Sequence, residues 1–148
     1  MTLQTLLALA AIAFGGACIA VQAPINARLA AHVGDPVAAS AISFAVGLVV
    51  LVAITVLVGG VPTLEEASGA PWWAWVGGFL GAVYVWAAIW SVGTLGVVTM
   101  VAGLIFGQLA AALILDASGA FGIAVREISW TRIAAVGFVA VGLVLSRI

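Results

Sequence analysis

The chain has 148 residues, of which 66% are hydrophobic and only 6% are charged. Soluble domains carry about 25% charged residues, so this composition excludes a soluble globular protein and indicates an integral membrane protein. The net charge of −1 and the lack of lysine exclude the basic patch with which proteins bind nucleic acid.

Five apolar runs follow one another along the chain, and each is long enough to cross about 30 Å of hydrocarbon as a helix. A segment in lipid must satisfy its own backbone hydrogen bonds, and runs of this length fit helices better than the strands of a barrel, which are about ten residues long. The short connections leave no room for a separate soluble domain. We therefore expect an all-α integral membrane protein with a single transmembrane domain, 1–148, and five transmembrane helices at about 1–28, 36–60, 71–92, 94–115 and 129–147.

Three of the connections between these runs carry signals for the start of a helix. Asp35 followed by Pro36 is typical of an N-cap and a first-turn proline. Thr63 and Glu66 have the spacing of a capping box, which predicts a short surface helix before the third run. Ser129 predicts the N-cap of the last helix.

Glycines four residues apart predict close approach between helices. Gly77 and Gly81 form one such pair in the third run, and Gly103 and Gly107 form another in the fourth. Small residues at this spacing let helix backbones come together in lipid. We expect both pairs to lie at contacts between helices.

The four arginines do not favour either orientation in the membrane. With five crossings, Arg126 and Arg132 fall on one face, and Arg28 and Arg147 fall on the other. Orientation is normally set by an excess of lysine and arginine on the cytoplasmic side, and here that excess is close to nil. We therefore expect the chain to insert both ways up and to assemble as an antiparallel dimer of ten helices, an arrangement suited to alternating access.

Polar side chains inside the apolar runs are the candidates for a substrate site, because they are costly in lipid and usually face a cavity or another helix. At about 1.5 Å per residue, six of them fall at similar depth, and Gln108 reaches that depth only in an inverted second copy. The candidate substrate-binding residues are Gln22, Asn26, Ser40, Ser43, Tyr84, Thr99 and Gln108. Two structural alternatives stay open: serine and threonine can bond their own backbone one turn back, and the amides can join neighbouring helices.

Asp116 and Arg132 form a second candidate feature. Each opposes the dipole of the helix end at which it lies, so an ion pair between them would relieve both. The pair could be structural, or Asp116 could couple transport to protons. Cys18 is the only cysteine, which excludes an intramolecular disulfide and a cysteine zinc cluster.

The chain resembles a known family along nearly its whole length. The stretches that carry this resemblance, in order, are 22–29, 41–47, 77–82 and 107–116. They are similar to the small YdcZ-like half-transporters of the drug/metabolite transporter superfamily. The resemblance implies a five-helix unit in a bacterial-type cytoplasmic (inner) membrane that pairs with an inverted copy of itself or with a close paralogue. It also implies that the first four helices line the substrate path and that the fifth packs at the periphery.

The first apolar run departs from the pattern of the related four-helix small multidrug exporters. Those exporters carry a membrane-embedded glutamate in their first helix, and the first run here has none. The resemblance therefore does not extend to proton-coupled export of cations by that route.

These observations favour a small-molecule membrane transporter, an exporter of small organic metabolites or drugs that acts as a dual-topology antiparallel homodimer by alternating access. A dual-topology ion channel and an accessory membrane subunit without transport of its own are the alternatives. No acid/base pair, activated nucleophile or metal-ligand set can be assembled from the sequence, so we expect neither an enzyme nor a cofactor or metal site. The expected partners are the lipid bilayer, a second copy or paralogue, and a small-molecule substrate.

Overall fold

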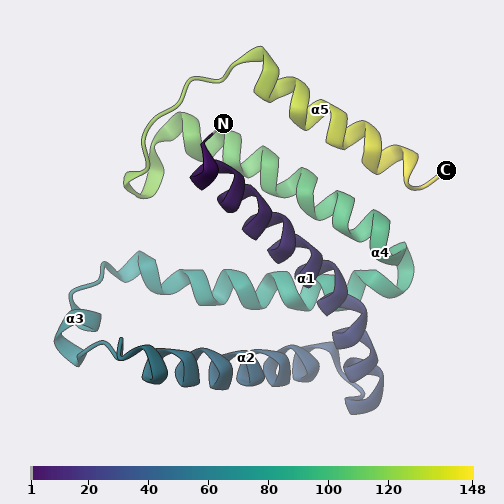
Figure 1. Ribbon diagram of the computed structural model, residues 1–148. Coiled ribbons are helices and arrows are strands. Elements are labelled where there is room, and N and C mark those ends of the chain that lie inside the picture. The colour runs from purple at the N-terminus through teal and green to yellow at the C-terminus, as the bar shows by residue number, and fades with distance from the viewer. Residues whose placement is uncertain (1) are drawn as a thin grey trace. The chain divides into compact units, whose positions relative to one another are not determined.

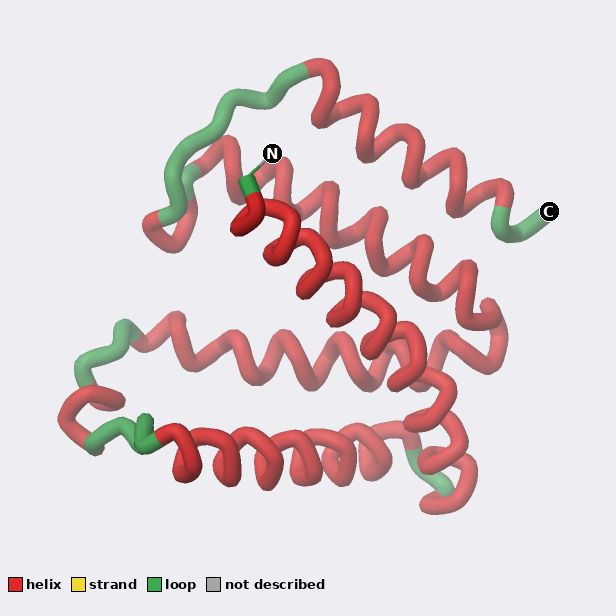
Figure 2. Tube along the Cα trace, viewed as in Figure 1, coloured by secondary structure: helices red, strands yellow, loops and turns green. Residues whose placement is uncertain are grey.

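The structure is a computed structural model that describes residues 2–148, so Met1, where the first expected span begins, lies outside the described residues. Figure 2 shows helices joined by loops throughout, and residues 2–148 contain no strand. The all-α prediction is confirmed. The chain forms two compact units, unit 1 (Met1–Thr94) and unit 2 (Leu95–Ile148). The single domain expected from the sequence stays a prediction.

Three helices are long and apolar enough to cross a membrane. They are α1 (Leu3–Val33), α2 (Pro36–Val58) and the run Trp72–Ser118, in which the 3-10 helix Trp72–Trp75 leads into α4 (Val76–Ser118). The last helix, α5 (Trp130–Leu145), is apolar but has 16 residues, fewer than the roughly 20 that a crossing needs. A fifth crossing therefore stays a prediction.

The run Trp72–Ser118 contains the fourth of the expected spans and all but the first residue of the third. Gly96 interrupts the helical backbone of α4 with φ 74° and ψ 167°, a conformation that is essentially restricted to glycine. The helical segments on either side, 76–95 and 97–118, are each about 30 Å long at a rise of 1.5 Å per residue. Each segment is therefore long enough to cross the hydrocarbon by itself.

α2 and α5 begin directly after the N-cap residues predicted from the sequence. The Asp35 carboxylate accepts a hydrogen bond from the Ala38 N–H at 2.7 Å, and Pro36 occupies the first turn of α2. Ser129 caps α5 by accepting from the Arg132 N–H at 3.4 Å. Both N-cap predictions are confirmed, because a side-chain oxygen satisfies a backbone donor that has no partner within the helix.

The surface helix α3 (Leu64–Ser68) begins with the expected capping box. The Thr63 backbone N–H and hydroxyl donate to Glu66 Oε2 at 2.8 and 2.9 Å, and the Glu66 N–H donates to Thr63 Oγ1 at 3.2 Å. The two bonds that Thr63 donates stabilise the carboxylate and hold the pKa of Glu66 below its ordinary value, the bond from the backbone N–H having the larger effect.

Unit 1 is built from α1, α2 and the first segment of α4, which runs in the opposite direction to α2 (Figure 1). Its buried centre consists of Ala30, Ala39, Val85 and Ile89, so two of its four residues are alanines. A Cβ placed on Gly81 would lie 3.4 Å from Phe44 Cζ of α2. Gly81 therefore lies at the contact between α2 and α4, where the Phe44 ring would be in van der Waals contact with a Cβ at this position.

Unit 2 is a hairpin of the second segment of α4 and α5. Three contacts follow its length: Thr99 with Ser146, Gly103 with Leu143, and Asp116 with Arg132. Residue numbers rise on one helix as they fall on the other, which defines an antiparallel pair. A Cβ on Gly103 would lie 3.7 Å from Leu143 Cδ1, whereas nothing lies within 4 Å of a Cβ on Gly77 or Gly107. The prediction therefore holds for one glycine of each pair.

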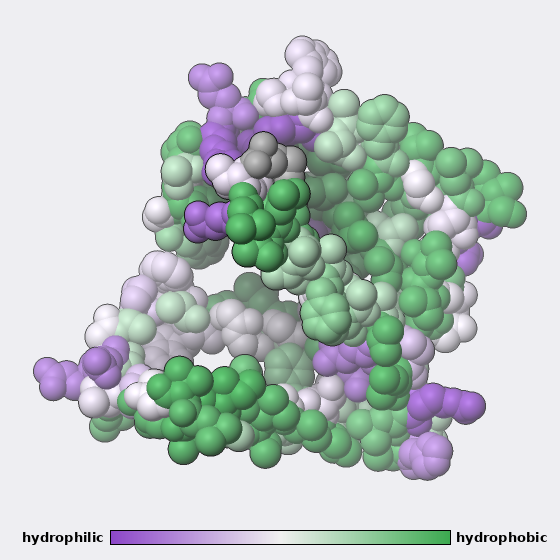
Figure 3. All heavy atoms as spheres, viewed as in Figure 1, coloured by the Kyte–Doolittle hydropathy of each residue, from purple (hydrophilic) through white to green (hydrophobic). Residues whose placement is uncertain are grey.

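The surface of α2 is strongly apolar, and Figure 3 shows hydrophobic side chains covering it. Leu48, Val49 and Leu51 are between 62% and 68% exposed. Soluble monomeric proteins rarely expose an apolar surface of this extent to water. We take lipid, or another helix within lipid, to be the medium that covers it.

The contact between Gly81 and Phe44 yields a stability prediction. We expect Gly81→Leu to lower the free energy of unfolding by about 1–3 kcal/mol, because a larger side chain forces the Phe44 ring out of its position. Equilibrium unfolding with SDS, followed by tryptophan fluorescence, measures the loss. Gly77→Leu is the matched control, since nothing lies within 4 Å of a Cβ at Gly77. Equal effects at both positions would show that helix packing at Gly81 is not the cause.

Candidate substrate site

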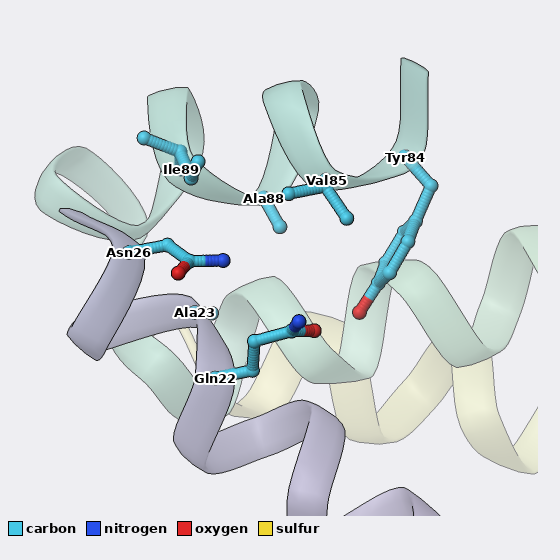
Figure 4. A pocket seen from close by; sticks show the side chains of 7 residues that line it. All are labelled: Gln22, Ala23, Asn26, Tyr84, Val85, Ala88 and Ile89. Atoms are coloured by element: carbon cyan, nitrogen blue, oxygen red, sulfur yellow. The ribbon is translucent and has the colours of Figure 1, made fainter. Parts of the chain in front are cut away.

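A narrow crevice separates α1 from the first segment of α4 in unit 1 (Figure 4). It is too tight to hold a water molecule. Its lining consists of three polar and four apolar residues: Gln22, Ala23, Asn26, Tyr84, Val85, Ala88 and Ile89. The side chains of Gln22 and Tyr84 point into the same space from opposite sides (Figure 4).

A wider groove of about 400 Å³ adjoins this crevice and is bounded by α1, α2 and α4. It falls within the volume range typical of small-molecule sites, about 300–1,000 Å³. Its lining residues are Gln22, Ser43, Phe44, Gly47, Leu48, Leu51, Gly81, Tyr84 and Val85. Gln22, Tyr84 and Val85 line both spaces. These three residues therefore form the boundary between the crevice and the wider groove. We call the wider groove the unit 1 groove.

Asn26 joins α1 to α2 beside the groove. Its side chain is only 5% exposed, and its Nδ2 donates to Ser43 Oγ at 3.1 Å. This is the helix-joining role that the sequence left open for the amides. Because Ser43 also lines the unit 1 groove, the bond fixes the position of a polar group that a ligand would meet.

Gln22 and Tyr84 supply the hydrogen-bonding groups that remain available. Gln22 is exposed and Tyr84 is partly buried, and neither side chain has a hydrogen-bond partner within residues 2–148. An amide offers two donors and an acceptor, and a phenol offers a donor and an acceptor. Both groups can therefore bind a ligand in the groove without losing a bond within the protein.

Ser40 and Thr99 have partners of their own. The Ser40 hydroxyl donates to the Pro36 carbonyl oxygen at 2.8 Å, one turn back in α2, and Ser40 does not line the unit 1 groove. Thr99 Oγ1 donates to the Ser146 carbonyl oxygen at 3.0 Å and accepts from Ser146 Oγ at 3.1 Å. The structure therefore shows structural bonds for both residues, and Thr99 belongs to unit 2.

Gln108 also belongs to unit 2, where its side chain is exposed. No hydrogen bond from its amide to another residue is present in the described part of the chain. Its expected meeting with the polar layer of an inverted copy stays a prediction.

Asp116 and Arg132 form an ion pair at one end of the unit 2 hairpin, from Arg132 Nη2 to Asp116 Oδ2. Both side chains are partly exposed, at 26% and 31%. Arg132 Nη1 also donates to the Glu127 carbonyl oxygen at 3.4 Å, and the Arg126 N–H donates to the Asp116 carbonyl oxygen at 2.8 Å. These bonds tie the loop before α5 to the end of α4, which is the structural use that the sequence allowed for the pair.

Sequence reasoning missed part of the site. Phe44, Leu48 and Leu51 line the groove at a spacing of four and three residues, which places them on one face of α2. Only Phe44 directly follows a predicted site residue, Ser43, and the sequence held no signal for Leu48 or Leu51. Among residues 2–148, no group of three or more histidine, cysteine, aspartate or glutamate side chains could hold a metal ion.

Comparison with known proteins gives one match. A model of the family described as "Putative inner membrane exporter, YdcZ" matches residues 6–145. No curated protein and no solved structure matches the chain.

The bond between Asn26 and Ser43 predicts coupled effects on stability. Asn26→Leu and Ser43→Ala should each lower the free energy of unfolding, and the double variant should lose less than the sum. The expected coupling is about 0.6–1 kcal/mol, the usual strength of a hydrogen bond between membrane helices. Equilibrium SDS unfolding of the four proteins measures it. Strict additivity would show that the bond adds nothing to the packing of α1 against α2.

The ion pair predicts a second coupling, in unit 2. Asp116→Asn and Arg132→Gln should each cost about 1 kcal/mol of unfolding free energy, because each leaves a partly buried charge without its partner. The double variant should cost about as much as either single variant. A transport assay of Asp116→Asn separates the two roles of the pair. If this variant keeps pH-dependent transport, Asp116 does not couple transport to protons.

Proposed function

We propose that this chain, which belongs to the YdcZ family of inner membrane exporters, exports small organic molecules as an antiparallel pair of copies by alternating access. The family is one of transporters rather than enzymes, and the apolar helices agree with a multi-pass location in the inner membrane. The observation that carries the proposal is the unit 1 groove. It has the volume of a small-molecule site and contains two polar side chains without partners within residues 2–148.

The antiparallel pair is supported by the charge distribution and by the shape of the groove. Arginines are shared equally between the two expected faces, so the positive-inside rule favours neither orientation. The groove is open rather than enclosed. A second helix-rich surface is therefore needed to shield a ligand from lipid, and an inverted copy would supply it together with Gln108.

Two variants with opposite charge bias test this function. Glu65→Lys/Glu66→Lys adds positive charge to the connection that contains α3, and Ala31→Lys/Val33→Lys adds it to the turn between α1 and α2, on the opposite expected face. Each variant should insert in one orientation, because positive loops stay on the cytoplasmic side. We expect neither variant alone to export, and we expect export to return when both are expressed together.

Orientation and export are read separately in this experiment. In a Cys18→Ser background, cysteines placed at Ser68 or Ile148, both exposed, report orientation through a membrane-impermeant maleimide. About half of the otherwise unmodified protein should label from outside at either position. Untargeted mass spectrometry of the medium reports export. Full labelling at one position and none at the other, in the protein without added lysines, would overturn the antiparallel pair.

A further inference from the structure

The unit 1 groove contains no charged side chain among the residues that line it. Its polar groups are the Gln22 amide, the Ser43 hydroxyl and the Tyr84 hydroxyl. Arg28, the next charged residue along α1, lies about 9 Å from Gln22 by helical rise and does not line the groove. A charged ligand would therefore give up its hydration without gaining an opposite charge, which is strongly unfavourable in an apolar site.

The hydrogen-bonding groups of the groove favour a ligand that both donates and accepts. The Gln22 amide can pair with a second amide through two parallel bonds, one in each direction. Tyr84 can add a third bond from the opposite side of the space (Figure 4). Ser43 is held by Asn26 through its oxygen, which leaves its own O–H to donate.

The rest of the groove is apolar. Phe44, Leu48 and Leu51 present side chains from α2, whereas Gly47 and Gly81 present only backbone. The Phe44 ring lies beside Gly81, whereas nothing lies within 4 Å of a Cβ on Gly47, so an aromatic ring adjoins an open strip of glycine backbone in the groove. A planar apolar body fits such a surface better than a branched one.

We infer that the unit 1 groove selects uncharged ligands with a planar apolar body and one carboxamide-like end, which is bound by Gln22 and Tyr84. This inference rests on the proposed export function for its biological meaning, but it concerns binding alone. It names a substrate class by charge and shape, and it assigns recognition of the carboxamide-like end to Gln22 and Tyr84.

Three probes of nearly the same shape test this inference: naphthalene-2-carboxamide, which is neutral, naphthalene-2-carboxamidine, which is cationic, and naphthalene-2-carboxylate, which is anionic. Equilibrium dialysis against the full-length protein in lipid nanodiscs, with protein-free nanodiscs as the blank, measures the binding of each. We expect the carboxamide to bind at least about tenfold more tightly than either charged probe. Equal or tighter binding of a charged probe would overturn the inference.

Variants of the two polar residues separate a built site from simple partitioning into an apolar groove. Gln22→Leu and Tyr84→Phe should each weaken carboxamide binding by about threefold to tenfold, the worth of one or two hydrogen bonds. Thr55→Val is the matched control, because the Thr55 hydroxyl donates to the Leu51 carbonyl oxygen within α2 and Thr55 does not line the groove. Unchanged binding in both groove variants would show that the naphthalene ring alone is recognised.

Gln22→Glu tests whether Gln22 contacts the ligand, because a purely structural role of Gln22 would not change which probe is preferred. This nearly isosteric change puts a carboxylate in place of the Gln22 amide in the groove, so the preference should shift from the carboxamide towards the carboxamidine. Failure of this shift, in a variant whose unfolding matches that of the wild type, would overturn the role of Gln22. Because these measurements use binding only, they stay informative if the orientation experiment disproves the antiparallel pair.

Discussion

The hydrogen bond from Asn26 Nδ2 to Ser43 Oγ orients α1 relative to α2, which apolar packing alone cannot do. In lipid, two apolar helix faces gain little from meeting, because the lipid tails are as apolar as the side chains that they replace. A buried side-chain amide, in contrast, has few possible hydrogen-bond partners, because the backbone N–H and C=O groups of the helices already bond to one another. Asn26 therefore fixes which face of α1 meets α2, and the position of the unit 1 groove follows from that choice.

The groove exists because α2 is buried only near its start. Ala39 and Ser40 are buried, whereas the most apolar 18-residue window of α2 has no buried residue. The small side chains of Ala30 and Ala39 let α1 and α2 approach closely at this end. The groove-lining residues from Ser43 to Leu51 lie further along α2, where its surface is no longer covered. α2 thus packs tightly against α1 near its N-terminal end and leaves its surface open for the groove further along.

The sequence predicted local features of this structure better than the shape of the site. The caps at Asp35 and Ser129 depend on neighbours within a few residues, so the pattern alone was sufficient. Equal depth grouped Gln22, Asn26, Ser43 and Tyr84, which the structure brings together, but it could not separate them from Ser40, whose hydroxyl bonds its own helix. Phe44, Leu48 and Leu51 were missed because α2 is apolar around its whole circumference. Without contrast between its faces, no periodic signal shows which side lines a groove.

The scarcity of charge in this chain has two separate consequences. It leaves too few basic residues for the positive-inside rule to predict one orientation in the bilayer, and it leaves the unit 1 groove without a carboxylate or histidine among its lining residues. A proton therefore has no acidic or imidazole group in the groove at which it could compete with a ligand. Coupling to protons would have to act from the ends of helices, where charged residues such as Asp116 and Arg132 lie. That pair ties the loop before α5 to the end of α4, so a substitution that breaks it acts first on the hairpin of unit 2 and not on a ligand in the unit 1 groove.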